Sequence, residues 1–178
     1  MRKLSMAELG RKSVEEFKAS EKTPIILVLE NIRSAYNVGS VFRTSDAFLV
    51  QSIYIIGYSA KPPHKEIKKT ALGAEETVEW KYFKTTAEAI TELREAGFNV
   101  YAAEQAEGSF KLNAIGFDPE EKIAVVFGNE VTGVEQTTIA LCDGCLEIPQ
   151  LGMKHSLNIA TAAGVVLWEL VRSRINAS

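Results

Sequence analysis

The chain has 178 residues, of which 46% are hydrophobic and 24% are charged, a balance typical of a globular protein with a full core. Its formal net charge of −3 argues against a general polyanion binder, although positive charge can still gather locally. No apolar run approaches the length of a membrane span, and the N-terminus lacks a signal-peptide core. We therefore expect a cytoplasmic protein without a membrane partner.

Apolar runs alternate with amphipathic segments from residue 25 onward. The predicted strands cover residues 25–29, 52–56, 79–83, 99–103, 122–127 and 145–148. The predicted helices cover residues 5–18, 37–49, 85–96, 134–142 and 156–174, and a proline-containing loop at 59–65 leads into a lysine-rich segment. Such alternation predicts one α/β domain over 1–178, in which a mainly parallel sheet carries helices on both faces and 1–24 form a short helical extension.

The stretch from Asn31 to Phe48 follows the first strand, where open α/β folds place their chemistry. Apolar and small residues at helical spacing predict a core stripe made of Val38, Val41, Phe42, Ser45 and Phe48 or Leu49. Arg43 lies off that stripe, and its neighbours one turn away are Gly39, Ser40 and Ala47, which are small enough to admit a large ligand. The alternative is an ordinary surface arginine.

Two later stretches also follow strands. Gly128 and Gly133 flank the acidic Glu130, so a ligand can approach the backbone closely, although a plain turn explains the same residues. Ser156 is a candidate N-cap of the last helix, and Asn158 could assist that cap. Residues 165–168 and 170 of this helix are all apolar and cannot share one face, so we expect the helix to be buried or to lie in a subunit interface.

The order and spacing of these motifs resemble one family. Asn31, Asn37, Gly39 and Arg43, then FGNEVTG at 127–133, then IP at 148–149 and SLN at 156–158, look like the three motifs of the SpoU, or TrmH, group of SPOUT RNA methyltransferases. The resemblance covers residue 25 to about residue 171. It implies methyl transfer from S-adenosylmethionine to a ribose 2′-hydroxyl of tRNA or rRNA. It also implies a C-terminal deep trefoil knot that binds the cofactor, and a homodimer with the active site at its interface.

The resemblance also assigns roles to residues by motif position. The catalytic set would be Arg43, Asn37, Glu130, Ser156 and Asn158. Contacts to the cofactor would come from Ala103, Gly128, Gly133, Ile148 and Leu157, with the strand end at Ala103 and Glu104 nearby. Local positive charge suggests RNA contacts at Arg33, Lys61, Lys65, Lys68 and Lys154, with a solvated loop as the alternative for the lysines of 61–69. Departures from the common pattern at Gln150, His155 and 159–162 leave the target RNA open.

Two chemical roles are open for Arg43. Free guanidinium has a pKa above about 12, so Arg43 would need help from a substrate phosphate to act as a base. Alternatively, Arg43 binds that phosphate with both guanidinium nitrogens and lowers the pKa of the hydroxyl electrostatically. Asn37 and Asn158 suit positioning roles, Ser156 suits orientation of Arg43 or substrate, and Glu130 could hold Asn37 or Arg33.

Three rival functions remain. A SPOUT enzyme that methylates a base nitrogen would not need Arg43, and a non-catalytic RNA-binding protein would not need the intact motif set. A redox or zinc protein would use the CxxC pair Cys142 and Cys145, but no second pair follows, and the pair runs into a predicted strand rather than opening a helix. We expect two buried thiols and no metal.

Overall fold

A computed structural model of the chain describes residues 1–10 and 12–177. Within these residues, seven strands form one sheet in the order β3-β2-β1-β6-β4-β7-β5, and every neighbouring pair is parallel. The strands are β1 (Thr23–Glu30), β2 (Val50–Ile56), β3 (Trp80–Phe83), β4 (Asn99–Ala103), β5 (Phe110–Lys111), β6 (Ile123–Phe127) and β7 (Gly144–Glu147).

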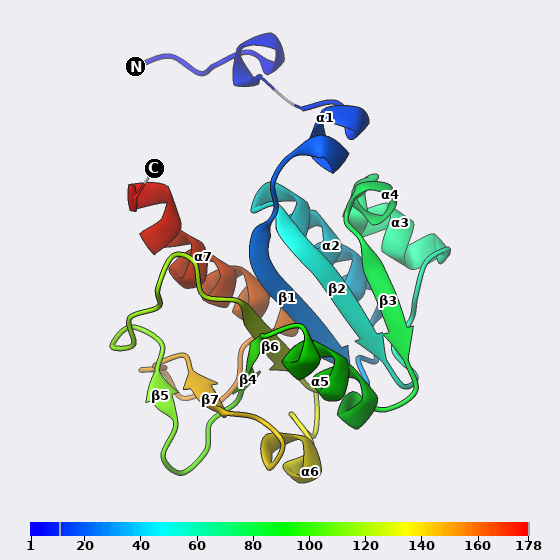
Figure 1. Ribbon diagram of the computed structural model, residues 1–178. Helices are drawn as coiled ribbons and strands as arrows, with labels where there is room; N and C mark the ends of the chain where they lie inside the picture. Colours follow the sequence, from blue (N-terminus) through cyan, green and yellow to red (C-terminus); the bar gives the residue numbers. More distant parts are fainter. Residues whose placement is uncertain (11, 178) are drawn as a thin grey trace.

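Helices cover both faces of the sheet (Figure 1). They are η1 (Met6–Leu9), α1 (Val14–Ala19), α2 (Ala35–Ala47), α3 (Lys65–Ala71), α4 (Ala74–Thr77), α5 (Thr86–Glu95), α6 (Gln136–Ile139) and α7 (Ile159–Ala177). The predicted α/β architecture, with a parallel sheet between two helical layers, is confirmed. No helix among the described residues is long and apolar enough to cross a bilayer.

Strand β1 shows why the sheet is buried on both faces. Ile25, Leu27 and Leu29 point into the core formed with α2, α3 and α7, whereas Ile26 and Val28 point into the core formed with α5. Successive side chains of a strand alternate between faces, so a continuous apolar run fills two cores at once. The apolar run in the sequence was therefore a reliable strand signal.

Several predicted boundaries were wrong for local reasons. The predicted helix 5–18 is two short helices, η1 and α1, because Gly10 adopts a left-handed conformation between them; residue 11 lies outside the described residues. The predicted helix 134–142 shrinks to the single turn α6. Strand β5 has only two residues and gave no periodic signal, and α3 and α4 were missed within and after the lysine-rich segment.

The last helix begins three residues later than predicted. Helix α7 starts at Ile159, so Ser156 is not its N-cap. Asn158 occupies that position instead, and its Oδ1 accepts a hydrogen bond from the Ala160 amide at 2.9 Å. Strand β7 lies between β4 and β5 although it follows both in sequence, and the segment between β7 and α7 lines the same cavity as the ends of β4 and β6. The trefoil knot itself stays a prediction.

Gly39 has a different role from the one expected. It is buried where α2 crosses α3, and a Cβ atom there would lie 2.1 Å from Thr70 Oγ1 and 2.4 Å from the Ile67 carbonyl oxygen. The absent side chain therefore allows two helices to pack closely and does not make room for a ligand beside Arg43. The predicted core stripe of α2 is confirmed, because Val38, Val41, Phe42 and Ser45 are buried and Phe48 and Leu49 are half-buried.

We expect Gly39→Ala to destabilise the fold. The new methyl group meets backbone atoms of α3 that cannot rotate away, and overpacking of this kind costs about 1–3 kcal/mol. The matched control is Gly164→Ala in α7, where the nearest atom, Thr44 Cγ2, is 3.9 Å away and alanine gains helix propensity. Urea unfolding at fixed protein concentration measures both variants. A Gly39→Ala midpoint equal to that of the wild type would contradict the close packing.

Candidate active site

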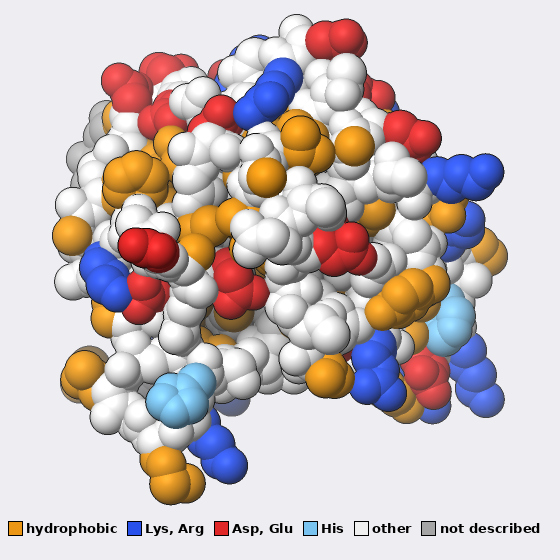
Figure 2. All heavy atoms as spheres, turned by 90° about the horizontal axis from the view of Figure 1, so that it is seen from below, with side chains coloured by type: hydrophobic (Ala, Val, Ile, Leu, Met, Phe, Trp, Pro, Cys, Tyr) orange, Lys and Arg blue, Asp and Glu red, His pale blue; other side chains and the backbone are white. Residues whose placement is uncertain are grey.

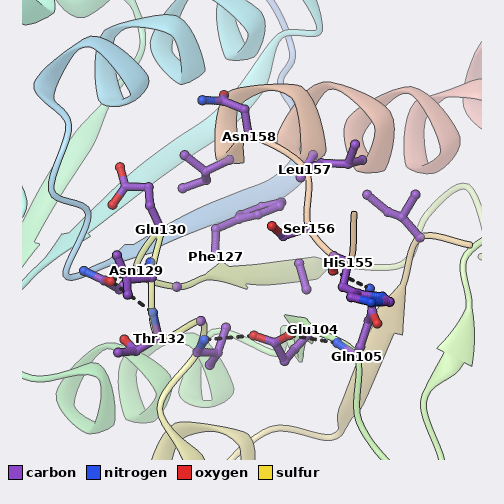
Figure 3. A pocket seen from close by; sticks show the side chains of 18 of the residues that line it. Glu104, Gln105, Phe127, Asn129, Glu130, Thr132, His155, Ser156, Leu157 and Asn158 are labelled. Atoms are coloured by element: carbon purple, nitrogen blue, oxygen red, sulfur yellow. Dashed lines mark hydrogen bonds between the residues drawn. The ribbon is translucent and has the colours of Figure 1, made fainter. Parts of the chain in front are cut away.

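Three loops meet around one cavity at the carboxyl edge of the sheet (Figure 3). They follow β6, β4 and β7, which are consecutive neighbours in the sheet, and the start of α7 also lines the cavity. The cavity measures about 550 Å³, within the size range of small-molecule sites. Its lining includes all five residues predicted to contact a cofactor, namely Ala103, Gly128, Gly133, Ile148 and Leu157.

The loop after β6 folds back on itself in a tight turn. Asn129 and Gly133 exchange two backbone hydrogen bonds, at 3.0 and 2.9 Å. Gly128 packs so closely that a Cβ atom there would lie 2.2 Å from backbone atoms of Gly133 and Val134. Gly133 has a φ of 71°, a conformation that favours glycine. The two glycines thus expose backbone on the cavity wall, as the sequence pattern indicated.

Asn129 fixes this loop to the rest of the site. Its Oδ1 accepts hydrogen bonds from the amides of Val131 and Thr132, at 2.8 and 3.2 Å, and its Nδ2 donates to the Asn31 carbonyl and to Tyr58 Oη. Asn129 is buried, and all four bonds are at least partly shielded from water. Asn129 was not among the predicted site residues, although its place between two motif residues was a usable signal.

Glu130 joins the second motif to the first. Its carboxylate accepts hydrogen bonds from the backbone amides of Arg33 and Ser34, at 2.9 and 3.1 Å, and from Asn37 Nδ2 at 2.9 Å. These donors lie at the N-terminal end of α2, where a negative charge is favoured by the free amides and the helix dipole. The sequence left open whether Glu130 binds Asn37 or Arg33. In the structure it binds both, Arg33 through its backbone amide and Asn37 through its side chain.

The surroundings of Glu130 keep it ionised. Burial, the largest single influence, raises the pKa of this carboxyl, but the hydrogen bonds from Arg33, from Asn37, from its own backbone and from Ser34 together outweigh burial. The pKa of Glu130 therefore lies below its usual value. At neutral pH the group is a fixed acceptor rather than a proton donor.

Asn37 and Asn158 connect the first motif to the third. Asn158 Nδ2 donates to Asn37 Oδ1 at 3.1 Å, while Asn37 Nδ2 donates to Glu130. Helix α7 lies beside α2, and further along the pair Thr44 faces Gly164 and the Phe48 ring lies 6.4 Å from that of Trp168. One chain of hydrogen bonds thus runs across residues 37, 130 and 158, which come from the three motifs.

Ser156 and Glu104 present oxygen atoms to the cavity. Ser156 lies exposed in the loop before α7 and lines the cavity, as Figure 3 shows. Glu104 directly follows β4, at the strand end that was expected near the cofactor. Its carboxylate accepts hydrogen bonds from the amides of Gln105 at 2.9 Å and Val134 at 3.1 Å.

Arg43 does not line this cavity. It is exposed on α2 and makes no hydrogen bond or ion pair with any described residue. The residues predicted to contact RNA are exposed as well: Arg33 precedes α2, Lys65 and Lys68 lie on α3, Lys61 lies in the loop before α3, and Lys154 lies in the loop before α7. The fold therefore separates these cations from the cavity while placing Arg33 beside Glu130.

The cysteine pair does not provide reactive thiols. Cys145 is buried in β7, as the sequence predicted, and Cys142 is half-buried. Burial raises the pKa of Cys142 to about 12 and also raises the pKa of Cys145, so neither supplies the thiolate that redox exchange requires near neutral pH. Among the described residues, no group of three or more His, Cys, Asp or Glu side chains is placed to hold a metal.

Known proteins are similar to this chain in sequence and in fold. A tRNA (guanosine(18)-2′-O)-methyltransferase of Thermus thermophilus is 32% identical over 170 residues, which cover 96% of this chain and 86% of that protein. A 23S rRNA (guanosine-2′-O-)-methyltransferase of Vibrio parahaemolyticus is 30% identical over 96% of this chain and 68% of that protein. The solved structure of an AdoMet-bound rRNA methyltransferase from Sinorhizobium meliloti superposes with a TM-score of 0.79 at 27% identity, over 86% of this chain and 57% of that one.

A family model also matches most of the chain. The model describes the SpoU rRNA methylase family, and its match runs over residues 24–168, from β1 into α7. That span includes all three motifs and the whole of the cavity described above. The resemblance seen in the sequence is confirmed, and the chain belongs to the SpoU rRNA methylase family.

Proposed function

We propose that this protein transfers a methyl group from S-adenosylmethionine to a ribose 2′-hydroxyl of tRNA or rRNA. The observation that carries the proposal is the joining of three motifs, distant in sequence, by Glu130 and Asn158 around one cavity of cofactor size. Membership of the SpoU family and relatives named as 2′-O-methyltransferases of both RNA classes support the reaction. We also place this reaction in the cytoplasm, as relatives that modify tRNA and rRNA suggest.

The cavity fits S-adenosylmethionine chemically. Apolar side chains such as Phe127, Leu146 and Leu157 suit the adenine ring, and the exposed backbone beside Gly128 suits its polar edge. The Glu104 carboxylate suits the positive charges of the molecule. When bound there, S-adenosylmethionine supplies an electrophilic methyl group on a sulfonium. The protein's own residues then have to position the hydroxyl and accept its proton.

Arg43 is the residue we assign to the RNA. Its guanidinium has no partner among the described residues, so its donors are available to bind a phosphate with two parallel hydrogen bonds. Positive charge close to a ribose lowers the pKa of the 2′-hydroxyl and stabilises the developing oxyanion. The hydrogen bond between Asn37 and Asn158 joins the start of α2 to the start of α7. Because Arg43 lies on α2, this bond helps to fix its position relative to the cavity.

The side of α7 that faces away from the sheet supports a homodimer. Val165 is 39% exposed and Trp168 is 52% exposed, and both belong to one row of the helix that also contains Ile175. Apolar side chains gathered on one helix face mark an interaction surface. Because Arg43 does not line the cavity of its own chain, a second copy placed on this surface could bring the arginine of one protomer towards the cavity of its partner.

We expect S-adenosylmethionine to stabilise the protein. At a concentration about 100-fold above Kd, a ligand that binds the native state raises the Tm by about 5–10 °C for a chain of this size. Gly128→Ala should lose most of this shift, because its methyl group collides with the backbone of the loop that forms the cavity wall. The control Gly116→Ala adds a methyl group to open space and should keep the shift. An unshifted wild-type protein at millimolar ligand contradicts the assignment of the cavity.

Arg43→Ala should abolish methyl transfer while leaving S-adenosylmethionine binding near normal. Loss of one contact made in the transition state costs on the order of 10²–10³ in rate. Arg43→Lys should lose most activity as well, because lysine keeps the charge but not the planar fork. The matched control is Arg94→Ala, which removes an exposed arginine from α5 on the opposite face of the sheet.

The measurement is transfer of labelled methyl to bulk RNA, followed by digestion to nucleosides. A product methylated on the ribose is expected. Full turnover by Arg43→Ala, or a product methylated on a base nitrogen, would replace the proposal with the base-methylating alternative. Absence of any transfer by the wild type across tRNA and rRNA would favour a non-catalytic RNA-binding protein.

If the protein is a homodimer, its mass in solution should be twice that of the 19.6 kDa chain. Trp168→Glu places a charge on the exposed row of α7 and should shift the protein towards the monomer. The control Leu72→Glu changes an exposed apolar residue after α3, away from that row, and should leave the mass unchanged. Light scattering at micromolar concentration measures all three proteins. A wild-type mass of one chain would rule out the interface.

A further inference from the structure

A strip of aromatic and basic side chains leads away from the cavity. It begins at Tyr58, beside the loop after β6, passes Lys61 and Tyr82, and ends in a groove around Trp80; we call it the aromatic track. Figure 2 views the sheet from its carboxyl edge and shows Lys and Arg side chains gathered among hydrophobic ones to one side of a hollow. None of these aromatic residues has a role in the cavity itself.

Tyr58 is exposed yet firmly held. The residue is 64% exposed, while its hydroxyl oxygen accepts a hydrogen bond from Asn129 at 2.8 Å and its backbone amide donates to Asn31 Oδ1 at 3.4 Å. A core aromatic would bury its ring, and a freely mobile one would leave its hydroxyl unbonded. An anchored hydroxyl with an open ring face is the arrangement expected of a stacking surface, and Asn129 places this one at the cavity wall.

Tyr82 joins the backbone next to Tyr58 to a nearby cation. Its hydroxyl donates to the Gly57 carbonyl at 3.1 Å, and Lys61 Nζ lies 3.6 Å from the centre of its ring. This cation–π contact keeps the ammonium group at a fixed place on the surface. A nucleotide stacked on Tyr58 would therefore find a positive charge close to its phosphate.

The track continues into a groove of about 460 Å³ around Trp80. Trp80 and Tyr82 alternate with Lys81 along the edge strand β3, so both point to the same face of the sheet. Pro62 and Pro63 form an apolar wall of the groove, and Lys65 and Lys68 supply positive charge, while Glu75 and Glu76 make the far side acidic. Phosphates would be attracted to the lysine side and repelled from the acidic side, which orients a bound strand.

We propose that the aromatic track binds an unpaired segment of the substrate RNA next to the nucleotide being methylated. Bases stack on Tyr58 and in the groove around Trp80, while Lys61, Lys65 and Lys68 contact the phosphates. This inference rests on the proposed function and narrows its substrate to RNA that presents the target ribose in a loop or single strand. Aromatic side chains alternating with cations are the usual means of binding single strands.

Double-stranded RNA does not fit the track. In a duplex both faces of each base are covered by stacked neighbours, so an aromatic side chain can reach a base face only where the strand is unpaired. The lysines alone would bind either form of RNA through phosphates. Aromatic residues should therefore contribute to single-strand affinity and not to duplex affinity, and this difference is what the experiment measures.

The test compares binding of one fluorescent RNA oligonucleotide, as a single strand and as a blunt duplex, at one fixed salt concentration. Tyr58→Ala should weaken single-strand binding by between about fivefold and a hundredfold, the usual effect of losing one stacked base, and should leave duplex binding unchanged. Tyr58→Phe keeps the ring and should retain most of the affinity. The matched control Phe110→Ala removes an exposed aromatic ring from β5 at the opposite edge of the sheet and should have no effect.

A second measurement needs no change in the track. In a Trp168→Phe variant, Trp80 is the one tryptophan that remains, and stacking of the single strand should quench its fluorescence. The proposal would be overturned if Tyr58→Ala bound the single strand as tightly as the wild type does. It would also be overturned if Phe110→Ala lost as much single-strand affinity as Tyr58→Ala, or if Tyr58→Ala lost as much affinity for the duplex as for the single strand. These outcomes leave the S-adenosylmethionine shift and the Arg43 result untouched, so failure of the track is distinguishable from failure of the proposed function.

Discussion

The site depends on a single carboxylate at the start of a helix. Glu130 binds two backbone amides and one side-chain amide at the N-terminal end of α2, so the loop after β6 and the helix after β1 cannot move independently. Asn37, bound to Glu130, in turn accepts a hydrogen bond from Asn158 before α7. Arg43 lies on α2, and its distance from the cavity is therefore set by a carboxylate that it does not touch.

Close backbone packing gives the same site its shape. Gly128 and Gly133 let the loop after β6 fold back on itself, and Gly39 lets α2 pack tightly against α3. All three glycines belong to motifs, yet only the first two bear on the cavity. A glycine near a functional residue can therefore serve helix packing alone, and the sequence does not separate the two uses.

The surface that we propose for RNA binding combines positive charge with exposed aromatic rings. With a net charge of −3, RNA binding would depend on local basic clusters, and the lysines of 61–68, which we propose contact the phosphates, form such a cluster. The fold adds exposed aromatic rings, Tyr58 and Tyr82, whose hydroxyls are anchored to backbone and to Asn129. Cations attract any RNA, whereas rings discriminate unpaired bases, so the combination suits an enzyme that needs one ribose exposed.

The sequence by itself determined the alternation of strands and helices, the two-faced burial of β1 and the order of the three motifs, because these follow from local periodicity and residue type. It did not determine which partners Asn129 and Glu104 bind, that α7 begins at Ile159, or that Gly39 serves packing. Those facts depend on contacts between residues far apart in the chain, and only the sheet order, which places β6 and β4 between β1 and β7, brings the partners together.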